Sequence, residues 1–233
     1  MLALLAPVAL AQTASLNTAP AAYDERPQPS GQTVTLLTNG NVSAWEYQTF
    51  NNIPTTQYQT AYDDELGSKA LFAHSQKGAS GYVLQTSIDL QKTPWLHFQW
   101  RIDQMETGFD ERSKAGDDFA LRLYFITRSG LRYKSLSVVG SQAAMHTTWQ
   151  SPYSGLLYDL HIYSLGNKKT RGKWGKTTIN LAQLWQDIFD ESAPILNAAG
   201  LMTDGDSAGA EMRARYGNII FSNSSAPPFA IVE

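Results

Sequence analysis

The stretch Trp95–Asp103 decides the fold class, and it reads WLHFQWRID. Apolar side chains stand at every second position from Leu96 to Ile102, and polar side chains occupy most of the positions between them. Successive side chains of a strand point to opposite faces of a sheet, so this period of two predicts a strand with one face in the core. The opposite face is polar and ends in Arg101 and Asp103.

The same alternation recurs in Phe119–Thr127 and in Glu211–Ser222. The polar positions of the three stretches are Gln99, Arg101, Asp103, Arg122, Tyr124, Arg213 and Arg215. If the three strands share one sheet, their register brings these side chains to one polar face. The residues that we expect to converge there are Arg101, Asp103, Arg122 and Arg215. The acidic loop 110–118 is expected beside them.

Arginine and carboxylate side chains placed side by side suit the recognition of saccharides. Planar guanidinium groups and carboxylates give rigid, multidentate hydrogen bonds to vicinal hydroxyl groups or to sugar carboxylates. Aromatic side chains offer flat apolar faces to sugar rings. The aromatic candidates are Tyr124, Trp149, Tyr153 and Trp174. The alternative interpretation is a cross-strand ladder of ion pairs on a solvated sheet.

Short β-branched and aromatic segments, separated by Gly, Asn and Asp turns, follow one another along the chain. The further strands expected are 33–38, 45–50, 56–62, 69–74, 82–90, 131–139, 160–164 and 195–203. One helix is expected over Asn180–Phe189, with helical apolar spacing and Asn180 as its cap. The pattern predicts an all-β fold, a two-sheet antiparallel β-sandwich of jelly-roll type with one short helix.

Composition excludes several function classes. The 233 residues are 42% hydrophobic, and 18 basic against 21 acidic side chains give a net charge of −3. Because there is no basic excess to neutralise phosphates, nucleic acid is not expected as a partner. The absence of cysteine excludes disulfides, thiolate zinc sites and a cysteine nucleophile. The histidines lack the spacing of a metal site, and no serine stands in a G-x-S-x-G motif.

Four segments are expected along the chain. Residues 1–11, MLALLAPVALA, form an apolar run ending in small residues, interpreted as a short or truncated signal peptide. A loosely packed terminus is the alternative, and the run is too short for the ~20 apolar residues of a membrane span. Residues 12–32 are expected to be a flexible linker, 33–222 the β-sandwich domain and 223–233 a C-terminal tail. Export without cysteines favours a periplasmic or secreted bacterial protein.

Two long charged loops are candidates for function, since function concentrates in the loops of a rigid scaffold. The acidic loop Gln104–Asp118 carries Glu106, Asp110, Glu111, Arg112, Lys114, Asp117 and Asp118. The basic loop Gly166–Lys176 carries Lys168, Lys169, Arg171, Lys173 and Lys176 around Trp174. The alternative for both is a solvated loop without a binding role. The basic loop also lacks the first glycine of a phosphate-binding motif.

The segment Asp204–Gly209, DGDSAG, begins like a calcium-binding loop. Carboxylates stand at its first and third positions and glycine at its sixth. Its fifth position is Ala208 and its twelfth is Arg215, so it is not an EF-hand.

Asp204 and Asp206 remain candidates for a calcium site completed by Asp117 and Asp118. The interpretation that the sequence favours is no cofactor, with these aspartates in turns or paired with nearby arginines. Those arginines are Arg112, Arg213 and Arg215.

Three motifs stand in order along the chain: KTPWL to QWRID at 92–103, DER with KAGDDF and Arg122 at 110–122, and LMTD to YGNI at 201–219. Together they resemble a bacterial family, domain-of-unknown-function family 3047, over residues 33–222. Gly205 and Ser207-Ala208 depart from the residues usual in that family. The resemblance implies an exported β-sandwich similar to the galactose-binding-like jelly rolls of carbohydrate-binding modules. It implies no established activity and no catalytic residues.

The sequence thus favours an exported, non-catalytic β-sandwich that binds a saccharide or other polar glycan on a charged face. The ligand-binding residues expected are Arg101, Asp103, Asp110, Glu111, Arg112, Asp117, Asp118, Arg122, Tyr124, Trp174, Arg213 and Arg215. One alternative is a polysaccharide lyase or glycoside hydrolase in which Arg101, Arg122 and Arg215 neutralise an acidic glycan. Another is an interaction module without a small ligand.

Overall fold

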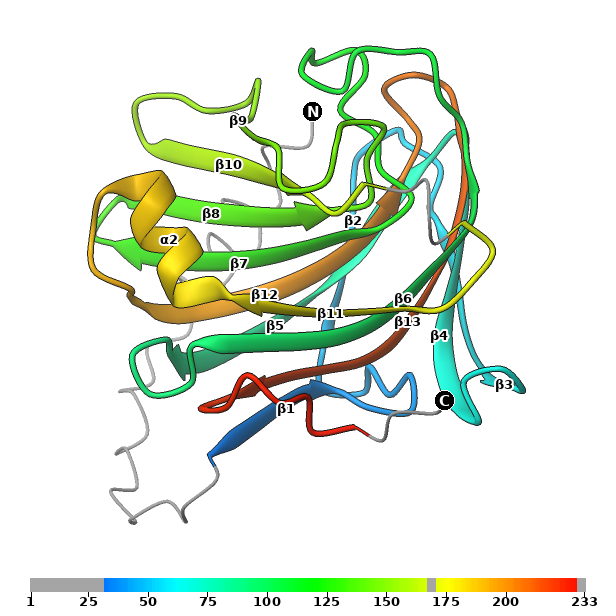
Figure 1. The fold of residues 1–233 in the computed structure, drawn as a ribbon. Coiled ribbons are helices and arrows are strands. Elements are labelled where there is room, and N and C mark those ends of the chain that lie inside the picture. Colours follow the sequence, from blue (N-terminus) through cyan, green and yellow to red (C-terminus); the bar gives the residue numbers. More distant parts are fainter. Residues whose placement is uncertain (1–31, 167–170, 230–233) are drawn as a thin grey trace.

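The computed structural model describes residues 32–166 and 171–229, whose strands form two stacked sheets (Figure 1). The predicted signal segment 1–11, the linker up to residue 31, Lys168 and Lys169, and residues 230–233 lie outside the described residues. Within the described ranges, no helix is long and apolar enough to cross a membrane. The all-β two-sheet sandwich that the alternation predicted is confirmed.

One sheet, which we call the β6 sheet, has the order β11–β6–β13–β4–β3, with β1 paired to β13. Its strands are β1 (Thr33–Leu37), β3 (Gln57–Asp63), β4 (Ser68–Gln76), β6 (Trp95–Met105), β11 (Gly175–Asn180) and β13 (Glu211–Ser222). All of these strands pair antiparallel.

The second sheet, which we call the β7 sheet, has the order β2–β5–β12–β7–β8–β10–β9. Its strands are β2 (Glu46–Thr49), β5 (Ala79–Asp89), β7 (Arg122–Ser129), β8 (Arg132–Val139), β9 (Thr148–Gln150), β10 (Tyr158–Ser164) and β12 (Ile195–Asp204). The pairing of β10 with β8 is parallel, so this sheet is mixed rather than purely antiparallel.

The core lies between the two sheets and is built by the alternating positions of the sequence. From the β6 sheet, Phe98, Trp100 and Tyr216 are each at most 2% exposed, and they belong to one apolar cluster with Leu123 and Phe125 of the β7 sheet. The period of two therefore identified the core face of β6, β7 and β13 correctly.

The expectation that these three strands share one sheet is wrong. β6 and β13 are neighbours, but β7 pairs with β12 and β8 in the other sheet. Arg122 is consequently separated from Arg101 by the whole core. The alternation of polar and apolar residues predicts which side chains of a strand point to the core. Both sheets of a sandwich turn one face to the core, so the alternation is the same in each. The pattern alone therefore does not tell the two sheets apart.

Two strands were not predicted, β9 and β11. β9 has three residues, and β11 (GKTTIN) follows the basic loop and has one large apolar residue, Ile179. Neither segment is long enough to show a period, so pairing with β10 and β6 rather than local sequence defines them.

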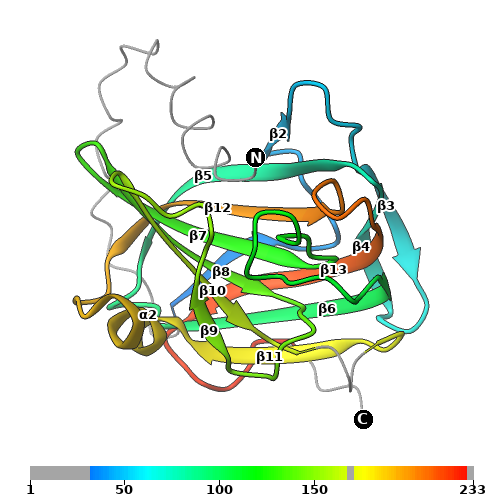
Figure 2. The same cartoon turned by 90° about the horizontal axis from the view of Figure 1, so that it is seen from above.

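The one helix of the described residues is α2 (Leu181–Phe189), at one end of the sandwich (Figure 2). As predicted, the side chain of Asn180 caps it by accepting a hydrogen bond from the backbone N–H of Gln183 at 3.0 Å. Trp185 is 1% exposed and lies 4.4 Å from Phe189 between ring centres. The apolar stripe of the helix thus closes that end of the core.

Replacing Trp185 by Ala is expected to lower the free energy of unfolding by about 3–5 kcal/mol, because the change leaves a large cavity at the end of the core. The melting temperature should fall by roughly 10 °C. Gln186→Ala, on the exposed side of the same helix, is the control and should change it little. Thermal unfolding followed by circular dichroism measures both, and equal effects would contradict the packing of α2 described here.

Candidate functional site

A chain of ion pairs, which we call the β6 ladder, crosses the outer face of the β6 sheet. Asp103 stands at its centre, accepting hydrogen bonds from Nε of Arg101 and Nε of Arg215, each at 2.7 Å. Nη1 of Arg215 donates to Asp63 at 2.6 Å, and Arg101 pairs with Glu65. Alternation turns Arg101, Asp103 and Arg215 to the face opposite the core, as predicted from the sequence.

Asp63 ties Trp174 of the basic loop to the β6 ladder. Its Oδ1 accepts hydrogen bonds from Nε1 of Trp174 at 3.0 Å and from the backbone N–H of Leu66 at 2.9 Å. Burial alone would raise the pKa of Asp63, but the Leu66 amide and the bond from Arg215 hold that pKa below its ordinary value of 3.8. The carboxylate is therefore charged at neutral pH, and the predicted site residue Trp174 does lie beside Arg215.

An open depression of about 740 Å³ lies next to the β6 ladder. Its lining residues are Gln57, Tyr58, Gln59, Phe72, Ala73, His74, Asp103, Arg213, Ala214 and Arg215. The guanidinium of Arg215 lies over the ring of Phe72, 4.5 Å from its centre. Two further lining residues, Arg213 and His74, share a carboxylate: Glu211 accepts one hydrogen bond from Arg213 and makes one with the ring of His74, both at 2.7 Å. Fixed charged groups thus surround an accessible hollow.

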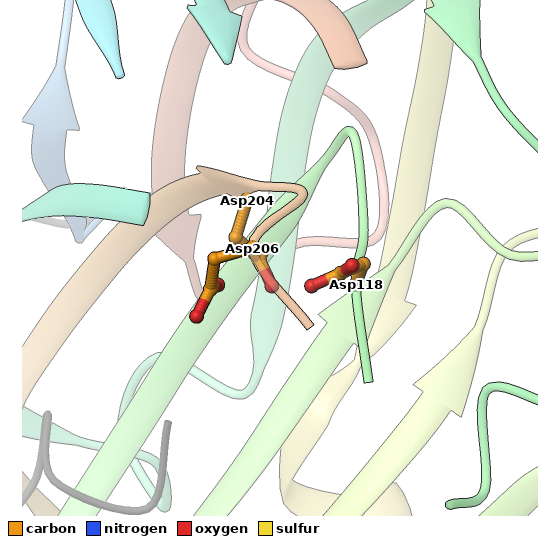
Figure 3. Close-up of side chains that lie close together, drawn as sticks. All are labelled: Asp118, Asp204 and Asp206. Atoms are coloured by element: carbon orange, nitrogen blue, oxygen red, sulfur yellow. The ribbon is translucent and has the colours of Figure 1, made fainter. Parts of the chain in front are cut away.

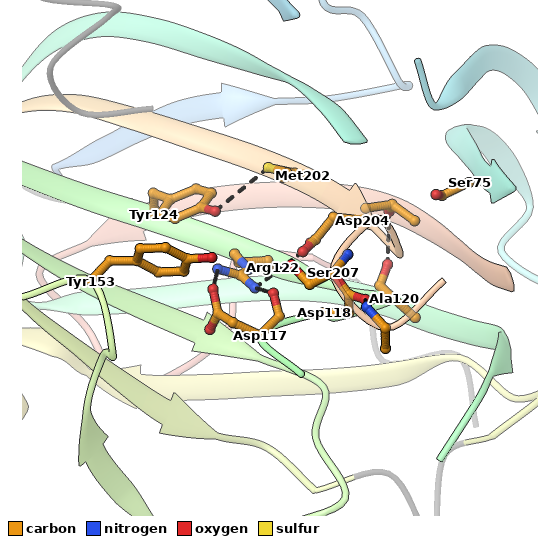
Figure 4. Close-up of polar contacts among 12 residues, drawn as sticks. Ser75, Asp117, Asp118, Ala120, Arg122, Tyr124, Tyr153, Met202, Asp204 and Ser207 are labelled. Atoms are coloured by element: carbon orange, nitrogen blue, oxygen red, sulfur yellow. Dashed lines mark hydrogen bonds and ion pairs between the residues drawn. The ribbon is translucent and has the colours of Figure 1, made fainter. Parts of the chain in front are cut away.

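A second charged group, which we call the Arg122 cluster, lies in the β7 sheet. It contains Arg122, Asp117, Asp118 and Asp204, which are buried (Figure 4), and the half-buried Asp206. Nη1 of Arg122 donates to Asp117 Oδ2 at 3.1 Å. Its Nη2 donates to the carbonyl oxygen of Asp117 at 2.8 Å and to Asp204 Oδ2 at 3.2 Å. Asp118 accepts two backbone hydrogen bonds from the loop that follows β12.

Burial dominates the electrostatics of the Arg122 cluster. It raises the pKa of Asp117 to about 6 although Arg122 opposes the shift. Burial also raises the pKa of Asp204 well above 3.8 against the same guanidinium, and the pKa of Asp206 rises through burial and the charge of Asp118. Like charges held together away from water disfavour their own ionised state.

The remaining residues of the acidic loop hold its shape. The carboxylate of Asp110 accepts a hydrogen bond from the backbone N–H of Arg112 at 3.0 Å, and the buried Glu111 bonds Ser141 and the N–H of Gln142. Arg112 lies over the ring of Trp149, 5.8 Å from its centre. The structure thus places these three predicted site residues away from the β6 ladder.

The arginines expected to balance Asp204 and Asp206 do not pair with them. Arg213 pairs with Glu211, Arg215 with Asp63 and Asp103, and Arg112 contacts Trp149. The partner of Asp204 is Arg122. Sequence proximity was a poor guide because alternation turns Arg213 and Arg215 of β13 to the outer face of the β6 sheet, whereas Asp204 ends a strand of the β7 sheet.

Several residues of the depression were missed from the sequence. They are Gln57, Gln59, Phe72 and His74. Asp63 of the adjoining β6 ladder was missed as well. A weak signal exists for Phe72 and His74, which hold alternate positions in β4, whereas Asp63 looks like an ordinary turn residue at the end of a strand. Only the pairing of β4 with β13, and of β3 with β4, brings them to the site.

Asp63→Asn is expected to lower the free energy of unfolding at pH 7 by about 2 kcal/mol, because it removes the charge that Arg215 pairs with while keeping the shape. The folded pKa of Asp63 is lowered, so its contribution is complete above the unfolded value of about 3.9 and is lost as the pH falls through the folded value. The difference in melting temperature between Asp63→Asn and the wild type should therefore disappear below about pH 4.

The neighbouring Asp64 is exposed, and Asp64→Asn provides the matched control. It should leave the melting temperature nearly unchanged between pH 3 and pH 7. A difference between Asp63→Asn and wild type that stays constant over this pH range would show that the charge of Asp63 does not stabilise the ladder.

Solved structures with a similar course of the chain include carbohydrate-binding modules and a cellulase. The family 30 carbohydrate-binding module of a cellulosomal cellulase from Clostridium thermocellum is 12% identical, with a TM-score of 0.45 over 82% of this chain and 96% of the module. An endoglucanase from Rhodothermus marinus is 12% identical, with a TM-score of 0.44 over 84% of this chain and 99% of the enzyme. At these values the likenesses assign neither ligand nor activity to this chain.

No curated protein matches the sequence. The family described as protein of unknown function DUF3047 matches residues 43–220. This match includes every residue of the β6 ladder and of the Arg122 cluster. Because it extends over most of the chain, the protein belongs to the DUF3047 family.

Proposed function

We propose that this protein is an exported, non-catalytic β-sandwich that binds a saccharide or other polar glycan in the depression beside the β6 ladder. The observation that carries the proposal is the presence of rigidly held guanidinium groups at an open hollow. Export rests on the apolar run 1–11 of the sequence, which lies outside the described residues.

The β6 ladder supports saccharide binding because it fixes hydrogen-bonding groups before a ligand arrives. Arg215 uses Nε and Nη1 for Asp103 and Asp63, and its remaining N–H groups make no hydrogen bond within the described residues. A guanidinium carries five N–H donors in a planar fork. A ligand hydroxyl therefore meets donors whose conformational entropy is already lost, which favours affinity.

The other lining residues supply what a sugar needs besides guanidinium groups. Gln57 and Gln59 expose amides that donate and accept hydrogen bonds, as a hydroxyl requires. Phe72 adds an aromatic wall for the C–H groups of a sugar ring. The charges of the ladder are already paired, so a neutral or weakly acidic polar ligand fits this surface better than a strongly charged one.

The alternative of a lyase or hydrolase has one observation in its favour, the raised pKa of Asp117 beside Arg122. General acids and bases often have such shifted values. However, Asp117 is 0% and Arg122 3% exposed, and neither lines the depression. A catalytic group has to come within hydrogen-bonding distance of its substrate, so the geometry favours binding without catalysis.

The proposal is tested by a glycan array with the purified full chain. We expect binding to a polar glycan that Gln59→Ala and Arg213→Ala each weaken about tenfold, as loss of one hydrogen bond predicts. Both side chains are exposed, so neither change should disturb folding. Gln85→Ala, an exposed strand position of the β7 sheet, is the matched control and should bind as the wild type does.

A reducing-end assay on the bound glycan separates binding from hydrolysis or cleavage, and no release of reducing ends is expected. Release of reducing ends would favour the lyase or hydrolase alternative. Absence of binding to every glycan, or binding that Gln59→Ala and Arg213→Ala leave unchanged, would contradict the proposed site.

A further inference from the structure

The Arg122 cluster brings three carboxylates from two separate parts of the chain to one point. Asp118 precedes β7, Asp204 ends β12, and Asp206 lies in the loop between β12 and β13 (Figure 3). One oxygen of each lies within 4.8 Å of one oxygen of each of the others. Calcium binds oxygen at about 2.3–2.6 Å, so two oxygens on one ion are at most roughly 5 Å apart. The three side chains therefore fit a single ion.

Among the carboxylates of Asp118, Asp204 and Asp206, two buried oxygens have no hydrogen-bond partner among the described residues, Asp204 Oδ1 and Asp206 Oδ1. Asp204 is 0% exposed, and its other oxygen accepts the bond from Arg122. Buried carboxylate oxygens are nearly always satisfied, because leaving one unpaired away from water costs free energy. A cation bound among the three carboxylates would satisfy both oxygens.

The charges of the cluster do not balance. Arg122 pairs with Asp117 and Asp204, and no basic side chain among the described residues forms an ion pair with Asp118 or Asp206. Asp118 is 1% exposed, so water screens its charge little. One guanidinium therefore faces four carboxylates, and a divalent cation would offset most of the excess.

The backbone holds the ligands in place. Asp118 accepts hydrogen bonds from the N–H groups of Ser207 at 3.1 Å and Ala208 at 2.6 Å, which fix the loop after β12 against the segment before β7. The loop is closed by the N–H of Ala210, which donates to the carbonyl of Gly205 at 2.8 Å. A Cβ at Gly205 would lie 2.3 Å from the carbonyl oxygen of Ala210, so only glycine fits this close approach.

We propose that Asp118, Asp204 and Asp206 bind one calcium ion, which joins the β12–β13 loop to the segment before β7. Oxygen ligands alone suit a hard cation, whereas zinc prefers histidine and cysteine. Calcium completes its shell of six to eight oxygens with water or carbonyl groups in flexible geometry. Magnesium demands a tight octahedron and gives up its waters reluctantly, so it binds this set of carboxylates less well.

The test uses the full chain, treated with chelator and titrated calorimetrically with calcium chloride and, separately, magnesium chloride. We expect one calcium per chain and weaker magnesium binding. At a calcium concentration about 100 times Kd, the melting temperature should rise by about 5–10 °C over that in chelator. Asp206→Asn should weaken calcium binding at least tenfold, because it removes one anionic ligand.

The half-buried position of Asp206 keeps this variant informative. Asp206→Asn relieves repulsion among the carboxylates, so in chelator it should melt no lower than the wild type, which a merely structural role would not predict. Asp64→Asn, at an exposed position outside the cluster, is the matched control. Absence of calcium binding, or wild-type affinity in Asp206→Asn, would overturn the site, and equal affinity for both ions would overturn the assignment to calcium.

Discussion

Arg101 of β6 stands directly opposite Arg215 of β13, and this pairing of like charges constrains much of the β6 sheet. Two cations at opposed strand positions repel unless an anion lies between them. Asp103 supplies it by bonding both guanidinium groups. In the next pair along the two strands, Trp100 faces Tyr216 on the core side. A slip of β13 by one residue would turn Tyr216 to the solvent and Arg215 to the core, so the ladder and the core enforce the same register.

The ladder also positions the segment that immediately precedes β11. Asp63 accepts hydrogen bonds from both Arg215 and the indole of Trp174, and this contact anchors the Trp174 end of the basic loop beside β3. β11, which follows that loop, then pairs with β6 and leads directly into α2. The charged residues of the β6 ladder thus also fix the position of the segment that leads through β11 into α2.

The sequence predicts the fold class, the core faces and the helix, because each depends on a local period or a local cap. It does not predict strand neighbours. Arg101 and Arg122 hold equivalent places in similar alternating patterns, yet they lie in different sheets. The role of Asp63 could not be predicted for the same reason, because it depends on Arg215, a residue that is distant in sequence. Part of the candidate site was therefore predicted, namely the part carried by β6, β13 and Trp174.

Burial separates two groups built from the same residue types. In the β6 ladder, Arg101 and Arg215 are 18% and 23% exposed at the side chain, so water and ion pairs share the stabilisation of their charges. A polar ligand can replace that water at modest cost. In the Arg122 cluster the side chains of Arg122 and Asp204 are 3% and 0% exposed, and only other buried groups can offset their charge. The ladder suits recognition of polar groups, while the cluster, with its excess of carboxylates, suits a cation.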